Sequence, residues 1–462
     1  MKKLRRAGVI LTLFFPLLTY GQMEKTGFTL DEARHYAIEH NREIQNARDN
    51  ITISDEVIKE ARSQGLPQVS ATLDFMTYFD YEIEFDLGMG SSSSPDLDYS
   101  VIDAGDQEIL SMIEQMFSPT NSEPIVMKNQ SNAKVQLNQL IFSGQYWVGL
   151  QTARIAKELS QKGLLKTELQ VKETVTNTFY IILITEHSLN IINDNIKNIE
   201  SIYNHTANMY NAGLAEKTDV DQLSINLSQL KNTSNSVKRN ITLSYSMLKF
   251  QLGIEPSLNI VLNESLDEIM EKSDFESSIL KELDINENVD YQLINGQVEI
   301  GEKQLALQKW AYSPTLVGFY SYTEKLQTTG LDMSPNHVAG LNLSIPIFSG
   351  GMRQSQLNQK KIELDVAKRN KSMVQDQLYL QEGNLKVNLN NAYENYQTQR
   401  DNVRIAKELY KSFENKYKQG ILSSLDLTQA HASYLNAENS YTAAMFELLQ
   451  AQLKIDILNT RL

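Results

Sequence analysis

The chain has 462 residues, and its 57 Asp and Glu residues outnumber its 43 Lys and Arg residues, giving a formal net charge of −14. Because phosphate binding needs clustered Lys and Arg, and the sequence has no such basic patch, we expect no nucleic-acid partner. The absence of Cys excludes disulfides, thiolate metal sites, a Cys nucleophile and a lipid anchor on an N-terminal Cys. With only 9 Pro and 21 Gly, the chain favours one extended architecture of long elements over several compact domains.

Residues 1–21 have the pattern of a secretory signal peptide. The basic start KKLRR precedes an apolar stretch at residues 7–19, and the small residue Gly21 follows. We therefore expect cleavage between Gly21 and Gln22 and export of the mature chain. The alternative is a membrane anchor, which needs about 20 apolar residues. Beyond residue 22 no apolar run is long enough for a transmembrane helix, so any membrane crossing must use β-strands.

The sequence contains an internal duplication. Residues 41–67 (NREIQNARDNITISDEVIKEARSQGLP) match residues 288–314 (NVDYQLINGQVEIGEKQLALQKWAYSP), and an Asn and a Pro stand 26 positions apart in both. Each stretch is predicted to be a helix that ends before Pro. We therefore divide the mature chain into a first structural repeat at 22–252, a linker at 253–285 and a second repeat at 286–462.

Apolar and polar residues alternate after each Pro, and they alternate again before each long helix. Such two-faced strands are typical of transmembrane barrels, in which about ten residues cross the membrane. Half-buried strands of a soluble sheet would alternate in the same way, so the pattern alone leaves both interpretations open. The apolar positions are Val69, Ala71, Leu73, Phe75, Ala133, Val135, Leu137 and Ile141 in the first repeat, and Leu316, Gly318, Tyr320, Tyr322, Ala339, Leu341, Leu343 and Ile345 in the second.

Both Trp residues of the chain lie at strand–helix junctions beside a Tyr, as the pairs Tyr146–Trp147 and Trp310–Tyr312. Aromatic girdles mark membrane interfaces, so these residues favour lipid-facing strands. Four strands cannot close a barrel, and an open edge in hydrocarbon leaves backbone groups unpaired, so several chains must share one barrel. Eight strands from a dimer would be filled by side chains, whereas twelve from a trimer could leave a channel. Periodicity does not choose between them.

The connection within the first strand pair, at about residues 80–127, is long and acidic. It holds 11 Asp or Glu residues and no Lys or Arg. We interpret it as a solvated extracellular loop. A divalent-cation site is the alternative, although DLDYSVIDAGDQE lacks the Gly that a calcium loop carries at its sixth position. The corresponding connection in the second repeat, around 323–336, is short.

Two long helices are predicted, at about 147–209 and 353–417. Each would extend roughly 95 Å at 1.5 Å per residue, which a compact domain does not need. Apolar residues recur every seven positions in both helices and continue in the shorter helices that follow, as in antiparallel coiled coils. In the long helices these are Ile182, Leu189, Ile196, Tyr203 and Tyr210, and, 207 positions later, Leu389, Tyr396, Val403, Tyr410 and Tyr417.

Related turns join each long helix to the next. The segments NAGLAEKTDVDQL and KQGILSSLDLTQA each contain a Gly followed by an aliphatic residue, with an Asp six positions after the Gly. The turns lie at 211–214 and 418–421, and each Asp falls in the first turn of a helix, where a carboxylate favours the helix dipole. The shared residues are Gly213, Leu214 and Asp219 in the first turn, and Gly420, Ile421 and Asp426 in the second.

The duplicated order of elements resembles the TolC-type outer-membrane channel proteins of Gram-negative efflux and secretion systems, over nearly the whole mature chain. The most specific motifs are TLDEARHYAIEHN, IFSGQ, IFSGG and the two turns. The resemblance implies a mixed α and β fold: a homotrimer with a shared 12-stranded transmembrane barrel, continued by a coiled-coil α-helical barrel through the periplasm. It also implies partners, namely outer-membrane lipid, a periplasmic adaptor protein and an inner-membrane transporter, and no cofactor.

The resemblance assigns roles to the two turns as periplasmic tips. Gly213–Leu214 and Gly420–Ile421 match adaptor-docking positions, and Asp426 matches an acidic ring at the tunnel entrance. Asp219 matches a residue that tethers the closed tip by bonding a Tyr and an Arg. Tyr417 fits that Tyr, but Leu422 stands at the Arg position, and Gln429 replaces a second ring Asp.

Two other classes of function compete with a channel. An enzyme is poorly supported, because the six His residues form no HExxH motif and the sequence has no Gly-x-Ser-x-Gly or P-loop pattern; we expect no catalytic or metal site. A secreted coiled-coil scaffold or adaptor explains the heptads, but it leaves the aromatic pairs and the twinned alternating stretches unexplained.

Overall fold

The structure is a computed structural model, and the predicted signal peptide, residues 1–21, lies outside the residues that it describes. Most of the acidic connection 80–127 and part of 323–336 also lie outside. The described residues are 27–77, 82–83, 103–116, 125–126, 129–327 and 334–461.

The described helices and strands follow the predicted order in both repeats. None of these helices combines the length and apolarity that crossing a bilayer requires. The elements are β1 Gly27–Phe28, α1 Leu30–His40, α2 Arg42–Ser63, β2 Gln68–Thr77, β3 Glu82–Ile83, α3 Ala104–Met116, β4 Ile125–Val126, β5 Asn129–Ser143, α4 Gly144–Asn211, α5 Lys217–Leu252, β6 Val261–Leu262, α6 Leu266–Lys272, α7 Phe275–Leu280, α8 Val289–Trp310, β7 Thr315–Gln327, β8 His337–Ser344, α9 Met352–Lys418 and α10 Ser424–Leu458.

The chain divides into two compact units, and each takes segments from both sequence repeats. The physical reason is that the long helices α4 and α9 each pass through both units. One unit contains the sheet of four long strands, and the other contains the two helical hairpins. The unit with the sheet comprises residues 50–160 and 294–372. The unit with the hairpins comprises residues 1–49, 161–293 and 373–462.

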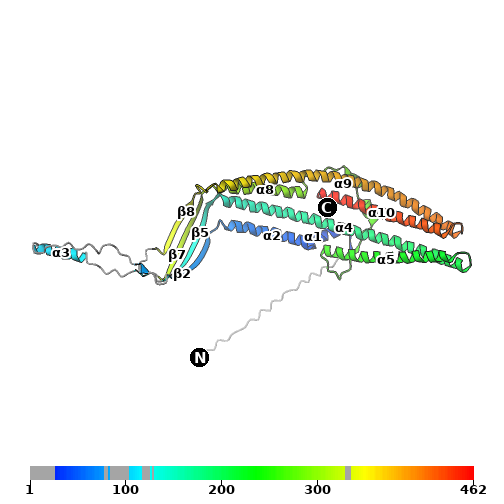
Figure 1. Ribbon diagram of the computed structural model, residues 1–462, viewed down its shortest axis with the longest axis horizontal. Coiled ribbons are helices and arrows are strands. Elements are labelled where there is room, and N and C mark those ends of the chain that lie inside the picture. The colour runs from blue at the N-terminus through cyan, green and yellow to red at the C-terminus, as the bar shows by residue number, and fades with distance from the viewer. Residues whose placement is uncertain are drawn as a thin grey trace, which may run out of the picture. The chain divides into compact units, whose positions relative to one another are not determined.

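The four predicted long strands form one antiparallel sheet in the order β2-β5-β7-β8 (Figure 1). Its register places the predicted apolar residues on a common face: Val69 pairs with Leu137, Leu137 with Tyr320, and Tyr320 with Ala339. Apolar side chains on this face are exposed in the single chain, with Leu73 72% and Leu341 70% exposed. The alternation in the sequence therefore corresponds to a sheet with one uncovered apolar face.

The alternation fails at one position of β5. The pairing between β5 and β7 shifts register between Leu140 and Phe142, so that Phe142 pairs with Leu316 and Ile141 is the extra residue. A Cβ added at Gly318, on the apolar face, would meet the Ile141 side chain at 3.1 Å. A β-bulge thus places Ile141 and Phe142 on the same face, which a strict period of two does not predict.

The acidic connection is more structured than the predicted solvated loop. It contains the 13-residue helix α3, and β3 pairs with β4 in an antiparallel ladder. The sequence of α3 places apolar residues at helical spacing, including Ile109 and Met112, both exposed. A short amphipathic helix therefore forms where the composition alone indicated a loop.

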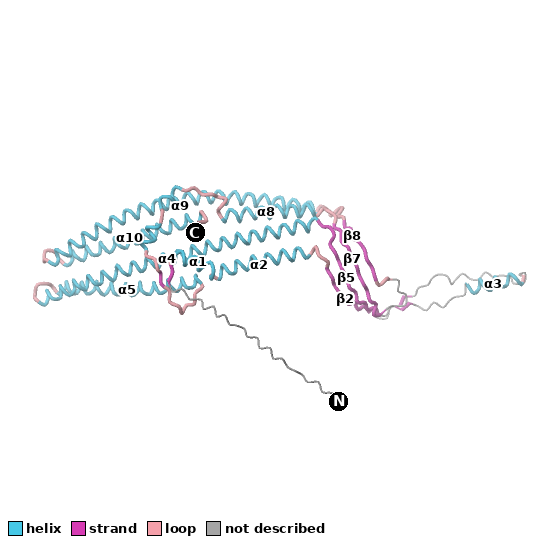
Figure 2. Tube along the Cα trace, turned by 180° about the vertical axis from the view of Figure 1, so that it is seen from behind, coloured by secondary structure: helices cyan, strands magenta, loops and turns pink. Residues whose placement is uncertain are grey.

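In the other unit, α4 with α5 and α9 with α10 form two helical hairpins (Figure 2). The predicted turns are confirmed: α4 ends at Asn211 and α9 ends at Lys418. Heptad residues form the core, since Ile182 and Leu389 are fully buried and Tyr410 is 3% exposed. A separate apolar cluster, here the tip cluster, joins the hairpins near the turns; it comprises Ile199, Ile202, Leu223, Tyr410, Tyr417 and Leu427, with Tyr203, Leu227, Leu230, Phe413, Leu422 and Tyr434 against it.

Candidate functional site

The first tip turn is a helix end closed by a left-handed glycine. Gly213 has a φ of +73°. Its N–H donates to the carbonyl of Tyr210 at 2.9 Å, and the N–H of Leu214 donates to the carbonyl of Met209 at 2.8 Å. This is the Schellman arrangement, in which two otherwise unpaired helix carbonyls accept hydrogen bonds and Gly avoids the penalty of a Cβ.

The second turn repeats this geometry. Gly420 has a φ of +72°, its N–H donates to the carbonyl of Tyr417 at 2.9 Å, and the N–H of Ile421 donates to the carbonyl of Lys416 at 3.0 Å. The shared Gly-aliphatic pattern thus encodes one turn twice.

Both turns present apolar side chains and bare backbone to solvent. Leu214 is 73% exposed and Ile421 is 70% exposed. A Cβ built on Gly213 or Gly420 would meet nothing within 4 Å. The glycines are therefore required by the turn conformation, and a larger side chain would project outward from the tip.

Asp219 joins the two hairpins. One of its carboxylate oxygens accepts the N–H of Glu216 at 3.2 Å, which caps the start of α5. The other accepts the hydroxyl of Ser424, at the start of α10. Asp219 therefore serves both as a cap and as a link between hairpins.

The predicted bond between Asp219 and Tyr417 is wrong. The Tyr417 hydroxyl instead forms a 2.6 Å hydrogen bond with Thr206 Oγ1 on α4, in a buried position. The physical reason is that Tyr417, one residue before the end of α9, packs into the tip cluster, whereas Asp219 meets the first residue of α10. Leu422, at the position of the expected Arg, packs against the tip cluster. Two separate polar contacts thus connect the hairpins.

Asp426 lies on the exposed surface at the start of α10. Its N–H donates to Ser423 Oγ at 3.2 Å, and the Ser423 hydroxyl lies 2.6 Å from Asp426 Oδ2. The helix-cap interpretation of this Asp therefore holds in the single chain. A carboxylate in this arrangement stays available to solvent, so the cap does not conflict with a role at a tunnel entrance.

A third polar contact between the hairpins lies deeper. His431 of α10 is 5% exposed, and its Nε2 lies 2.9 Å from Oδ1 of Asn195 on α4, which is 2% exposed. Sequence analysis missed this pair, and it also missed Ser424 and Thr206. Asn195 and His431 each stand one position beside a predicted heptad position, so a strict heptad pattern assigns them to the flank of the apolar stripe.

The predicted interface aromatics lie at the strand–helix junctions, and two of them cover glycines. A Cβ on Gly65 would lie 2.5 Å from the Tyr146 ring, and a Cβ on Gly144 would lie 2.1 Å from the Trp310 ring. Trp147 and Trp310 are 58% and 45% exposed. Gly at these two positions allows the rings to approach the backbone closely.

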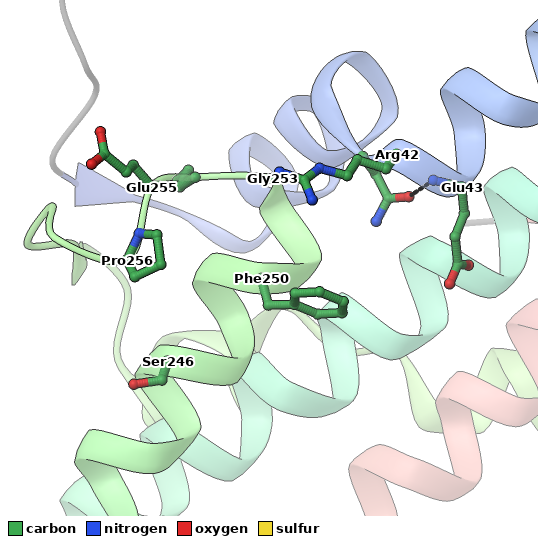
Figure 3. Close-up of a pocket in the computed structure, with 9 residues that line it drawn as sticks. Arg42, Glu43, Ser246, Phe250, Gly253, Glu255 and Pro256 are labelled. Atoms are coloured by element: carbon green, nitrogen blue, oxygen red, sulfur yellow. Dashed lines mark hydrogen bonds between the residues drawn. The ribbon is translucent and has the colours of Figure 1, made fainter.

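A cavity of about 380 Å³ lies beside the start of α2 and the end of α5 (Figure 3). Its lining includes Arg42, Phe250 and Asn41. The Asn41 side chain is already used by the fold, because it donates to the carbonyl of Gln251 at 2.7 Å and accepts the N–H of Glu43 at 2.7 Å. Among the residues that the structure describes, no three His, Asp or Glu side chains are grouped to hold a metal ion.

The family sequence model described as "Outer membrane efflux protein" matches residues 295–458. "Outer membrane protein TolC" of Salmonella enteritidis is 21% identical over 345 residues, which cover 71% of this chain and 69% of that protein. This chain therefore resembles the outer-membrane efflux proteins of the TolC family. Channels of this family form trimers that work with adaptors, and they extend a tunnel from the outer membrane into the periplasm.

Solved structures of outer-membrane channels share the TolC-type fold. The Campylobacter jejuni CmeC outer membrane channel is 14% identical, with a TM-score of 0.69, covering 94% of this chain and 86% of that one. The outer membrane protein VceC of Vibrio cholerae is 13% identical, with a TM-score of 0.67, covering 93% of this chain and 96% of that one. The predicted mixed α and β fold, with long helices and a four-stranded sheet, is confirmed.

Proposed function

We propose that this protein is the exit duct of a tripartite efflux or type I secretion system. It would pass small molecules or polypeptides outward from an inner-membrane transporter and a periplasmic adaptor. The observation that carries the proposal is the four-stranded antiparallel sheet, whose uncovered apolar face suits lipid and whose chain continues into two matched hairpins. Three copies would supply the twelve strands of one closed barrel.

The polar face of the sheet supports a water-filled lumen. Ser70 pairs with Gln136, and Gln136 pairs with Ser321, on the face opposite the apolar residues. Barrel channels place polar side chains inward and apolar ones toward lipid. A secreted scaffold, the alternative function, gives no reason for an apolar face such as that formed by Leu73 and Leu341 to remain uncovered.

The two tips would form the adaptor-facing end of the tunnel. Each presents an exposed aliphatic residue on a glycine turn, and the two turns have the same backbone geometry. Leu214 and Ile421 can therefore offer similar apolar contacts to a partner hairpin. Asp426 would complete the entrance as one member of a ring of three carboxylates.

Neutralising Asp426 with Asn is expected to lower the cation selectivity of the channel in planar-bilayer recordings. Three carboxylates at a narrow entrance would focus a negative potential that attracts cations. The same variant should weaken block by trivalent cations added from the periplasmic side. Asn can still accept the hydrogen bond from Ser423 that Asp426 accepts at 2.6 Å, so the helix start should persist.

The matched control is Asp401→Asn, which removes one exposed carboxylate from α9 well before the tip turn. It should leave selectivity and cation block near those of the unsubstituted channel. If Asp426→Asn behaves like this control, Asp426 is only a helix-capping residue. If the protein forms no pores in a bilayer, the proposed function as an exit duct is contradicted.

A further inference from the structure

The buried contact between His431 and Asn195 has a defined hydrogen-bond direction. The Asn195 amide nitrogen donates to the carbonyl of Ile191 at 2.8 Å, so its Oδ1 faces His431 as an acceptor. The imidazole must therefore donate through Nε2, as a neutral ring with its proton on that nitrogen can. This contact connects α10 of the second hairpin to α4 of the first.

An aromatic ring lies beside the imidazole and is itself stacked on a second ring. The Tyr410 ring centre lies 5.2 Å from that of His431, and Tyr410 stacks on Tyr434 at 5.7 Å with an interplanar angle of 5°. The Tyr410 hydroxyl is buried and has no hydrogen-bond partner among the residues that the structure describes. Such a poorly solvated site disfavours a charged group.

Burial lowers the pKa of His431 to about 4. Burial also raises the pKa values of its neighbours Tyr410 and Tyr434, so both are neutral and cannot balance an imidazolium charge. The fourth helix of the two hairpins is α5, and its side chains Leu227 and Leu230 pack against the tip cluster.

The carboxylates that act electrostatically on Tyr410 and Tyr434 are engaged elsewhere. Asp194 on α4 and Glu414 on α9 form ion pairs of 2.9 Å and 2.7 Å with lysines of their own helices. Glu438, two turns along α10 from His431, interacts with Tyr434 and helps raise its pKa. Protonating His431 would therefore place an uncompensated charge between the hairpins.

We propose that His431 and Asn195 form a proton-sensitive lock, which holds the two hairpins together at neutral pH and releases them in acid. The proposal rests on the proposed duct and adds a control on its entrance. Because the joined state binds fewer protons, its stabilisation is fully present above the ordinary pKa of His and is lost as pH falls toward about 4. The difference between the ordinary pKa of His and the pKa of about 4 of His431 corresponds to about a 300-fold change in the equilibrium constant between joined and separated hairpins.

The test uses spin labels on Leu214→Cys and Ile421→Cys, which are exposed and introduce the only thiols in the chain. Labelled chains are mixed with excess unlabelled chains in detergent-solubilised protein, so that distances within one chain dominate. Lowering the pH from about 7 to about 4 should lengthen and broaden the distance between the tips. His431→Gln should abolish this response, because Gln can donate to Asn195 but cannot take up a proton.

His205→Gln is the matched control, since His205 is exposed on α4 and should leave the response intact. Asn195→Asp supplies the missing carboxylate, so acid should then tighten the contact instead of releasing it. If His431→Gln does not fold, Asn195→Asp still tests the proposed lock. An unchanged acid response in His431→Gln, release by acid in Asn195→Asp, or constant distances in the unsubstituted chain would overturn the proposal. The measurement of distances between the tips does not require the protein to form a pore. A failure of the proposed exit-duct function would therefore be detected separately, by measuring conductance.

Discussion

Replacing Gly213 and Gly420 together with Phe is expected to reduce export to the level of cells that lack the protein. A Cβ at either position meets nothing within 4 Å, so each ring would project from the tip into the space proposed for the adaptor. The left-handed φ adds a conformational cost on the order of 1 kcal/mol at each turn. Neither effect reaches the sheet, so assembly and membrane insertion should persist. Export is measured by dye or drug accumulation beside the amount of assembled protein.

The matched control replaces the same two glycines with Asn, which adopts left-handed backbone more readily than other non-Gly residues and carries a small side chain. We expect the Asn pair to retain more export than the Phe pair. Normal export by a fully assembled Phe pair would show that docking lies elsewhere on the chain.

Removing the link between Asp219 and Ser424 is expected to raise single-channel conductance by loosening the closed tip. Ser424→Ala deletes only the hydroxyl that bonds Asp219, and it leaves the cap on the Glu216 N–H in place. A hydrogen bond to a partly exposed carboxylate contributes on the order of 1 kcal/mol, so the open fraction should rise about fivefold. Asp219→Ala should have at least this effect, because it also removes the cap.

A double-mutant cycle separates the observed contact from the one that sequence analysis predicted. Asp219→Ala and Ser424→Ala should be non-additive, because both remove the same bond. Asp219→Ala and Tyr417→Phe should be additive, because the Tyr417 hydroxyl bonds Thr206 instead. Coupling between Asp219 and Tyr417, with none between Asp219 and Ser424, would contradict the structure. Thr233→Ala, which removes an exposed hydroxyl from α5, serves as the control for conductance.

The elements of the fold were predictable because each carries a strong local pattern. The strand around Leu73 follows from alternation, and the turns at Gly213 and Gly420 follow from a left-handed position that only Gly occupies without strain. The bulge at Ile141 was not predictable, because an extra residue shows itself only against its partner strand. Helix α3 was obscured by the acidic composition around it.

The contacts between hairpins could not be derived from the sequence. Asp219 and Ser424 stand 205 residues apart, and Thr206 and Tyr417 stand 211 apart. Which side chains pair depends on how each helix is rotated about its own axis, because a rotation smaller than the step between neighbouring residues already changes the partner. A heptad repeat does not determine the rotation that finely. A resemblance supplied Tyr417 as a tip residue but assigned it the wrong partner.

The mass of the assembled protein in detergent, measured by light scattering with the detergent contribution subtracted, tests the shared barrel most directly. One chain of 462 residues has a mass of 52.5 kDa before removal of the predicted signal peptide. Three mature chains would have a protein mass of about 150 kDa, and they must assemble because four strands leave open edges that hydrocarbon does not tolerate. We predict this trimer mass. A stable monomer of about 50 kDa would contradict the account, because one sheet of four strands cannot enclose a channel.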